Sequence, residues 1–217
     1  MSRSTLICFA LKEEAGPFRK FAAEKADVSV LIVGIGRQNA ERSIRQHLAM
    51  QTPELVMTCG FAGGLNPDLK LGDVIFELSK QSGPPYVGCD KDLMAAGAKP
   101  VKFFCADRIA TTVAEKEKLR NETGADAVEM ESGAIHAVCR ERGIGCVTVR
   151  VISDTANEDL PLDFNALARP DQSLDFGKLA WAIARSPGKI GALMELQKKT
   201  SFAARQLAAV LDRITSR

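Results

Sequence analysis

The stretch of sequence that decides the fold is residues 125–154, ADAVEMESGAIHAVCRERGIGCVTVRVISD. A short apolar run opens it, a helix-like segment follows at Glu131–Arg142, and a β-branched run, Cys146–Ile152, closes it. A helix between two strands returns the chain to the same edge of a sheet. The pattern therefore predicts that Glu131 and Asp154 lie near each other and flank one ligand.

The same alternation of strand-like and helix-like segments covers most of the remaining sequence. The other predicted strands are Thr5–Leu11, Val28–Val33, Leu55–Cys59 and Val74–Leu78, with a short one at Ala125–Val128. The other predicted helices are Glu13–Ala23, Asn39–Met50, Thr112–Glu122, Leu174–Arg185 and Pro187–Ile214, the last broken or bent near Gly188–Gly191; Gln81–Pro100 is predicted to be a loop. This pattern predicts one α/β domain, residues 1–217, with a mostly parallel mixed sheet and a helical C-terminal extension from about residue 158.

Composition and charge narrow the class of partner. The 29 Lys and Arg nearly balance the 27 Asp and Glu, and a net charge of +2 gives no reason to expect nucleic acid as a partner. A small neutral or weakly charged substrate fits better. Residues 178–217 carry eight basic and two acidic side chains, and a solvated helical face is favoured there over contact with a membrane or subunit surface.

The cysteines and the N-terminus indicate the compartment. The six cysteines show no CxxC spacing, and four of them lie in or beside apolar stretches, so we expect reduced thiols in a cytoplasmic protein. The sequence shows no secretory signal pattern and no run of roughly 20 apolar residues. Export and membrane insertion are not expected.

Several glycine-rich and acidic segments follow the predicted strands, at the edge where open α/β sheets bind ligands. Gly34-Ile-Gly36 is either a phosphate-binding turn or a plain tight turn. A dinucleotide fingerprint would need a third glycine where Asn39 stands, so an NAD site is disfavoured. Gly60–Gly64 is predicted to be a turn after a strand that lets a ligand approach the main chain, and a purely structural turn is the alternative.

Acidic residues are the main candidates for chemistry. Glu13, Glu14, Glu129 and Glu131 stand where acidic side chains also favour the first turn of a helix, and that explanation alone accounts for their charge. The two histidines, His47 and His136, fall on predicted helices without metal-ligand spacing, so neither a metal site nor a Ser-His-Asp triad is expected.

Five motifs taken together resemble the nucleoside phosphorylase superfamily, and within it the methylthioadenosine/S-adenosylhomocysteine nucleosidases. They are residues 10–14 (ALKEE), 34–40 (GIGRQNA), 60–64 (GFAGG) with 70–73 (KLGD), 128–131 (VEME) and 150–154 (RVISD). The resemblance runs from the N-terminus to about residue 157. It implies a central twisted sheet flanked by helices, a homodimer or larger homo-oligomer, and cleavage of the N-glycosidic bond of a purine-type, adenosine-like nucleoside without metal or redox cofactor.

The resemblance also implies roles for individual residues. Glu131 would hold the ribose 2′ and 3′ hydroxyls, Asp154 would protonate purine N7, and Glu14 would activate water. Other substrate-binding residues would be Met130, which packs against the sugar, and Phe61, Ala62, Gly63, Ile109, Glu129 and Ser153; candidate phosphate-binding residues are Gly36, Arg37 and Gly64. An acid at the base and an anion near the ribose both act most strongly in an oxocarbenium-like transition state.

Three features depart from the nucleosidase pattern. Phe61 stands where the family commonly has Ser or Thr, and the segment between Asp73 and Asp107 is shorter than usual. After Asn157 the chain is longer, and motifs such as Leu160-Pro161 and residues 168–171 (ARPD) resemble the hopanoid-associated phosphorylase-like branch. That second resemblance implies a bulky 5′ substituent and a substrate presented at a membrane.

The sequence leaves the acceptor and the activity open between alternatives. Hydrolysis is favoured over phosphorolysis because a carboxylate such as Glu14 takes a proton from water but repels phosphate. Arg37 is the main counterargument, because a guanidinium there could serve phosphate. Phe61 and the shortened segment leave a noncatalytic nucleoside-binding protein as the alternative from another class.

Overall fold

The computed structural model describes residues 4–78, 89–167, 169 and 187–216. Its described strands form one eight-stranded sheet with the order β2-β1-β3-β8-β4-β5, to which β7 is added beside β3, and β6 beside β7. The strands are β1 (Thr5–Phe9), β2 (Val28–Ile32), β3 (Leu55–Gly64), β4 (Val74–Leu78), β5 (Lys99–Pro100), β6 (Phe103–Cys105), β7 (Ala127–Glu129) and β8 (Gly145–Asp154).

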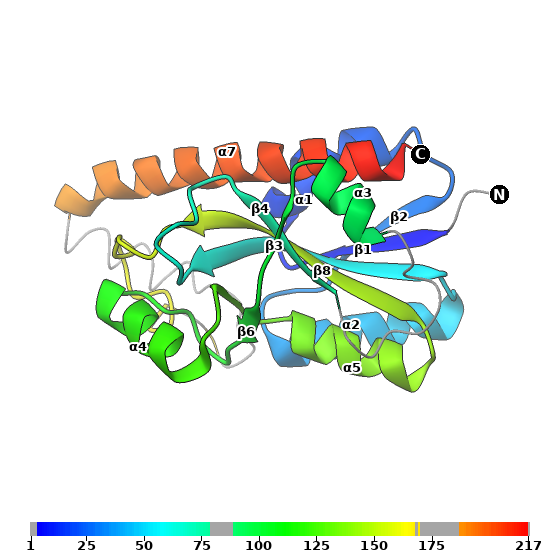
Figure 1. Ribbon diagram of the computed structural model, residues 1–217, viewed down its shortest axis with the longest axis horizontal. Helices are drawn as coiled ribbons and strands as arrows, with labels where there is room; N and C mark the ends of the chain where they lie inside the picture. The colour runs from blue at the N-terminus through cyan, green and yellow to red at the C-terminus, as the bar shows by residue number, and fades with distance from the viewer. Residues whose placement is uncertain (1–3, 79–88, 168, 170–186, 217) are drawn as a thin grey trace.

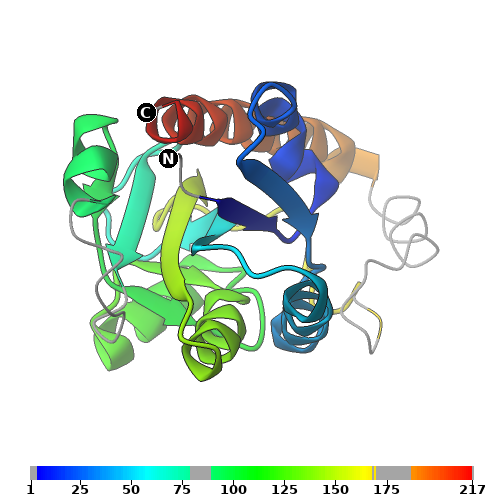
Figure 2. The same cartoon turned by 90° about the vertical axis from the view of Figure 1, so that its right-hand side faces the viewer.

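The helices cover both faces of the sheet (Figures 1 and 2). They are α1 (Lys12–Ala22), α2 (Arg37–Met50), α3 (Cys89–Ala95), α4 (Val113–Thr123), α5 (Ser132–Glu141) and α7 (Ile190–Thr215), the last preceded by a 3-10 turn, η2 (Pro187–Lys189). In both views α1 and α7 lie on one face, and α2 and α5 lie on the other. The prediction of an α/β fold with helices flanking a central sheet is confirmed.

The pairing of the strands is mostly parallel, as predicted. β1, β2, β3 and β8 are parallel neighbours, so their carboxyl ends share one edge of the sheet. β4 runs antiparallel to β8, and β7 runs antiparallel to the last residues of β3. Because β7 runs antiparallel to β3 and pairs with its last residues, Ala127 lies beside Gly64 and the chain then runs back along β3, so Glu129 lies near the carboxyl end of β3 although β7 points away from that edge.

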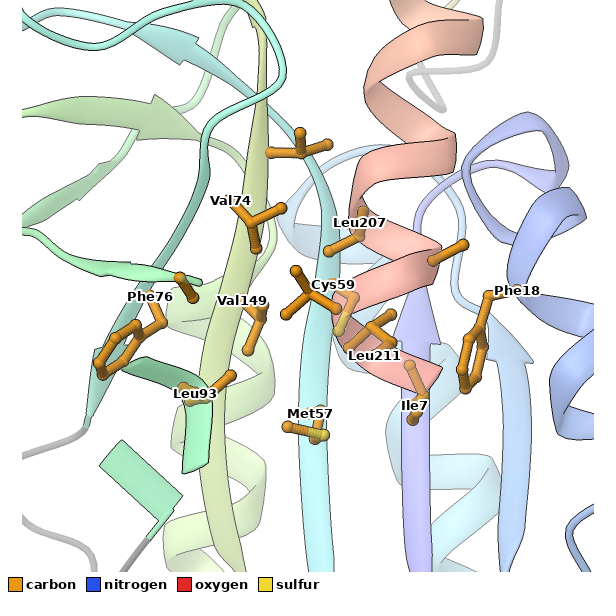
Figure 3. Close-up of a cluster of buried hydrophobic side chains, with 14 of the residues drawn as sticks. Ile7, Phe18, Met57, Cys59, Val74, Phe76, Leu93, Val149, Leu207 and Leu211 are labelled. Atoms are coloured by element: carbon orange, nitrogen blue, oxygen red, sulfur yellow. The ribbon is translucent and has the colours of Figure 1, made fainter. Parts of the chain in front are cut away.

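Alternation along the central strands builds a core on each face. Ile7 of β1 joins Phe18 of α1 and Leu211 of α7 in the cluster shown in Figure 3. Leu6, one residue earlier, packs on the opposite face with Ile44 of α2 and other residues of a second cluster. Successive side chains of a strand point to opposite faces. A strand covered by helices on both faces needs apolar side chains at nearly every position. β8 is such a strand, because it is buried along its whole length.

Two sequence predictions about secondary structure are wrong in part. The predicted loop at residues 81–100 contains α3 and β5, because Leu93, Ala96 and Ala98 bury their side chains in the core. The helix predicted at Pro187–Ile214, broken or bent near Gly188–Gly191, is a 3-10 turn at Pro187–Lys189 followed by α7 from Ile190; the change of helix type falls in the predicted region, although α7 runs through Gly191.

Part of the C-terminal prediction cannot be placed. The predicted helix at Leu174–Arg185 lies outside the described residues. Residues 158–167, where a helical extension was expected to begin, form turns, and helical structure is described again from Pro187. No helix in the described part of the chain is long and apolar enough to cross a membrane.

Candidate active site

A pocket of about 260 Å³ opens at the shared carboxyl edge of the sheet. Its walls come from the start of α1, the end of β3, the turn from β7 into α5, the end of β8, a loop at residues 108–110, and α7. The lining residues are Ala10, Leu11, Glu14, Ile35, Phe61, Ala62, Gly63, Arg108, Ile109, Ala110, Val128, Glu129, Met130, Glu131, Ser153, Asp154, Leu160, Phe164, Leu196 and Thr200. Most of this wall is apolar, and its acidic groups are concentrated in four side chains.

Most of the site residues predicted from sequence line this pocket. The three predicted catalytic carboxyl groups, Glu14, Glu131 and Asp154, do so, as do all seven predicted substrate-binding residues: Phe61, Ala62, Gly63, Ile109, Glu129, Met130 and Ser153. The three candidate phosphate-binding residues, Gly36, Arg37 and Gly64, are not part of the lining.

Glu14 enters the pocket from the first turn of α1 and is almost fully buried. Its Oε1 accepts a hydrogen bond from the Phe61 amide at 2.9 Å, and its Oε2 accepts one from the Leu11 amide at 2.9 Å. Burial raises the pKa of Glu14 above its usual range, although the nearby Arg150 charge and these amides oppose the rise. The carboxyl group is thus fixed in direction and holds a proton more readily than an exposed glutamate.

Gly60 makes this arrangement sterically feasible. Its φ is +145°, and a Cβ built there would lie 2.7 Å from both Glu14 Oε1 and Arg150 Nη1. A residue with a side chain would therefore displace one of the two charged groups. Gly60 therefore allows the Glu14 and Arg150 side chains to approach the backbone of β3 closely.

The guanidinium of Arg150 on β8 is buried and pairs with two of the carboxyl groups of the pocket. Its Nη2 is 2.5 Å from Glu129 Oε2 and 3.3 Å from Glu131 Oε2, and its Nη1 donates to the Cys59 carbonyl at 3.1 Å. Glu129 also accepts hydrogen bonds from both the amide and the hydroxyl of Ser132. Arg150 is therefore shared unequally, with Glu129 as its closer partner.

This unequal sharing separates the two glutamates in proton affinity. Burial opposes ionisation of Glu129, but the Arg150 charge and the Ser132 hydrogen bonds hold its pKa below the usual range. Burial raises the pKa of Glu131 to about 7; Arg150 opposes this rise, while the Glu129 charge adds to it. The two groups titrate as a pair, with Glu129 ionised first.

Asp154 ends β8, and both of its oxygens are held. Ser153 Oγ donates to Oδ1 at 2.8 Å, and Lys116 Nζ of α4 lies 2.7 Å from Oδ2. The side chain of Asp154 is 10% exposed, and that of Lys116 is fully buried. Sequence reasoning expected a partly buried carboxyl group here, and the structure adds a buried ammonium group in contact with it.

The glycine motif at residues 60–64 differs from its prediction. It was predicted to be a turn after a strand ending at Cys59, but β3 continues through it to Gly64, with a register shift between Ala62 and Gly63. The reason is tertiary, because β8 pairs with this segment on one side and β7 on the other. The irregularity places the Cα of Gly63 beside Asp154, where a Cβ would lie 3.2 Å from Oδ2.

The glycine turn before α2 supports a carboxyl group of the site. Gly34 and Gly36 both have positive φ, and the Gly36 amide donates to Glu131 Oε1 at 2.8 Å. The side chain of Arg37 is 58% exposed, with its Nε 3.7 Å from Asp107 Oδ1. The amide at this helix N-terminus is therefore engaged by Glu131, and Arg37 faces outward.

Sequence reasoning missed two charged residues, Arg150 and Lys116. Arg150 carries a detectable signal, because it is the one basic residue in the apolar run Cys146–Ile152. Lys116 carries none, because it sits in a strongly charged helix where a lysine normally faces solvent. Within the described residues, no group of three or more His, Cys, Asp or Glu side chains has the arrangement of a metal site.

The fold and the sequence together define the class. The sequence model of the family described as "Phosphorylase superfamily" matches residues 9–76 and 93–185, and the chain belongs to that family. The resemblance drawn from the five motifs is thereby confirmed at the level of the superfamily.

Individual relatives agree with the nucleosidase resemblance. A 5′-methylthioadenosine/S-adenosylhomocysteine nucleosidase from Shewanella halifaxensis is 29% identical over 168 residues, which is 64% of this chain and 73% of the relative. An enzyme of the same name from Glaesserella parasuis is 28% identical over 173 residues, with the same coverage of both chains.

Solved structures match along nearly the whole chain. The futalosine hydrolase of Helicobacter pylori superposes with a TM-score of 0.71 at 18% identity, covering 100% of this chain and 98% of its own. A Helicobacter pylori 5′-methylthioadenosine/S-adenosylhomocysteine nucleosidase gives 0.72 at 17% identity, covering 100% and 99%. At these identities the likeness shows the shared fold. The further resemblance to the hopanoid-associated branch stays a prediction.

Proposed function

We propose that this chain cleaves the N-glycosidic bond of a purine-type nucleoside, adenosine-like and substituted at the 5′ position, and releases the free base. The observation that carries the proposal is the meeting of Glu14, Glu131 and Asp154 in one largely apolar pocket. The family and the names of the relatives support the same reaction class. No metal or redox cofactor is part of the proposed mechanism.

Glu131 and Met130 form the proposed ribose subsite. Departure of the base makes the sugar oxocarbenium-like, and an anion placed beside it stabilises this positive charge more in the transition state than in the substrate. Glu131 Oε1 is held by the Gly36 amide, and its Oε2 faces Arg150 at 3.3 Å, so the carboxylate is oriented before substrate binds. Its two oxygens suit a pair of adjacent hydroxyl groups.

Asp154 is the proposed proton donor to the leaving base, with Ser153 fixing its carboxyl plane. Protonation of a ring nitrogen makes the base a neutral leaving group, which lowers the barrier to bond cleavage. The apolar side chains of Phe61, Ile109 and Phe164 line the same pocket and provide surfaces for a flat base or an apolar 5′ substituent.

Glu14 is the proposed base that activates water. Its raised pKa, caused by burial, places its proton affinity closer to neutral pH, where a general base works best. Water is favoured over phosphate because four acidic side chains line the pocket, whereas Gly36, Arg37 and Gly64 do not. Arg108 also lines the pocket, but its side chain is exposed and pairs with Glu115. An added phosphate would meet the acidic groups before the buried Arg150 and Lys116.

The test is base release from a panel of nucleosides by the purified protein. The panel holds adenosine, 5′-methylthioadenosine, S-adenosylhomocysteine, inosine and adenosines with larger 5′ groups, each with and without phosphate, and the sugar product is identified. We expect free ribose products without phosphate. Strict phosphate dependence with ribose 1-phosphate formation would instead establish phosphorolysis, and tight binding without base release would establish a noncatalytic binding protein.

A matched pair of variants tests the role of Glu14. Glu14→Gln is expected to lower turnover at least tenfold, whereas Glu13→Gln, one residue earlier and exposed, leaves it unchanged. Equal rates in both variants would remove Glu14 from the mechanism.

We further propose that the protein works as a homodimer or larger homo-oligomer. This rests on the family resemblance, and light scattering of the purified protein tests it. Contact of the basic C-terminal segment with an anionic surface, which is the less favoured alternative, is tested by sedimentation with anionic vesicles at low salt.

A further inference from the structure

Lys116 is an unusual residue for the interior of a protein, because its side chain is fully buried on α4. Its Nζ lies 2.7 Å from Asp154 Oδ2, and it donates to the Thr155 carbonyl at 2.7 Å and to the Glu158 carbonyl at 2.9 Å. These three oxygens use all three donors of an ammonium group. A buried ammonium is costly unless it is paired, so a specific charge partner is needed here.

The charge partner of Lys116 is Asp154, a carboxyl group of the pocket that does not pair with Arg150. Arg150 Nη2 serves Glu129 and Glu131, whereas Asp154 has Lys116. Lys116 is not part of the pocket lining, so it reaches a substrate only through Asp154. Lys116 therefore contacts the Asp154 carboxyl group from the interior of the protein and not from the pocket.

We propose that Lys116 is a positioning residue that stabilises the charge left on Asp154 when this residue gives its proton to the leaving base. The inference rests on the proposed function. In that step the Asp154 O–H bond breaks, an N–H bond forms on the base, and the electron pair stays on the carboxylate, 2.7 Å from the ammonium. The attraction grows as the negative charge develops, so it acts on the chemical step more than on substrate binding.

Several charged groups surround Asp154. They are Lys116 of α4, Glu158 and Asp159 of the following loop, Lys199 and Glu195 of α7, Arg108 of the pocket wall, and the group of Glu14, Glu129, Glu131 and Arg150 across the pocket. The Lys116 ammonium contacts the Asp154 carboxyl group directly, at 2.7 Å. Removing the Lys116 charge is therefore expected to weaken the stabilisation of negative charge that develops on Asp154 in the transition state.

A purely structural role is the competing explanation, because Lys116 also ties residues 155–158 to α4. The chain offers a matched control. Lys199 of α7 ties the same loop through Glu158 Oε2 at 2.6 Å, and its other ion pair is with Glu195 of its own helix. Lys199→Met therefore loosens the loop without removing the charge beside Asp154, and Lys118→Met removes an exposed lysine from the same helix.

The experiment measures kcat and KM of base release for Lys116→Met, Lys116→Arg and both controls. We expect Lys116→Met to lower kcat at least tenfold with KM changed less than threefold, and Lys116→Arg, which keeps the charge, to recover part of the loss. Lys199→Met and Lys118→Met should keep the wild-type kcat. A kcat of Lys116→Met equal to wild type, or a loss of rate shared equally with Lys199→Met, would overturn the proposal.

A second measurement separates this inference from the proposed function. The side-chain ¹³C signal of Asp154, assigned by its loss in Asp154→Asn, is recorded at one pH in wild type, Lys116→Met and Lys199→Met without any substrate. We expect the signal to shift in Lys116→Met, which removes the ammonium in contact with the carboxyl group, and to keep its wild-type position in Lys199→Met, whether or not a nucleoside is cleaved. If Lys116→Met does not fold, Lys116→Gln is compared instead; an unmoved signal in the folded variant refutes the inference.

Discussion

Glu131 should weaken the fold at neutral pH, and Glu131→Gln tests this. Burial raises the pKa of Glu131 from 4.5 to about 7. Below pH 4.5 both the folded and the unfolded chain hold the proton. As pH rises from 4.5 to 7 the unfolded chain releases it first, so the free energy of unfolding of the wild type falls across this window and is level above it.

The size of the effect follows from the two pKa values. From pH 5 to pH 8 the free energy of unfolding of the wild type should fall by about 2.5 kcal/mol because of Glu131, and the uncharged glutamine variant should not show this fall. The free energy of unfolding of Glu131→Gln should therefore rise by about 2.5 kcal/mol relative to that of the wild type over this range. In urea this is a relative shift of the midpoint of roughly 1 M.

The assay is urea unfolding followed by circular dichroism, at pH 5 and pH 8, for wild type and Glu131→Gln. Glu117→Gln on α4 is the control, because Glu117 is exposed and its substitution should leave the difference from wild type constant within about 0.5 kcal/mol. If the difference in unfolding free energy between Glu131→Gln and wild type is also the same at pH 5 and pH 8, burial does not raise the pKa of Glu131 in the folded protein, and the reasoning is refuted.

Two further predictions concern the same site. Glu131→Gln and Asp154→Asn should each lower turnover at least tenfold, which corresponds to about 1.4 kcal/mol of transition-state stabilisation. Circular dichroism should show that both variants keep the fold. Wild-type rates in both would contradict the site assignment. Gly60→Ala adds a methyl group 2.7 Å from a carboxylate oxygen and a guanidinium nitrogen, so the variant should lose base release. It should also be destabilised more than the control Gly97→Ala, because φ is positive at Gly97 too but no atom lies within 4 Å of the added methyl group. Equal losses of unfolding free energy in urea would contradict this.

The convergence of the acidic residues could be predicted because it depends on topology alone. Parallel strands joined by helices place their carboxyl ends at one edge, and Glu14 and Asp154 each follow or end such a strand. Glu131 reaches the same pocket by a different path, because it follows β7, which runs antiparallel to β3 along the last residues of that strand. The sequence pattern indicated the place correctly, but not this strand direction.

The contacts of these groups could not be predicted, because they join residues far apart in the chain. Gly36 lies 95 positions from the Glu131 carboxylate that its amide binds, and a local pattern of glycines cannot distinguish that partner from a phosphate. Lys116 looks like a surface lysine until Asp154 is placed against it. Similarly, Gly60–Gly64 has turn composition, and only the pairing of β7 and β8 on its two sides makes it a strand.

The placement of the two buried cations explains how the fold holds a pocket that is acidic on its open side. Arg150 and Lys116 both lie behind the carboxyl groups: neither lines the pocket, yet each is within 2.7 Å of a carboxylate oxygen that does. Their charge therefore reduces the repulsion among the acidic groups inside the protein, while the carboxylates themselves face the ligand. In the proposed reaction, a sugar that becomes positive meets this nearby negative charge and is stabilised. Arg108 lines the pocket, but its side chain is 64% exposed and pairs with Glu115. A phosphate would therefore meet the carboxyl groups first, with Arg150 and Lys116 behind them, and this charge arrangement favours water as the proposed acceptor.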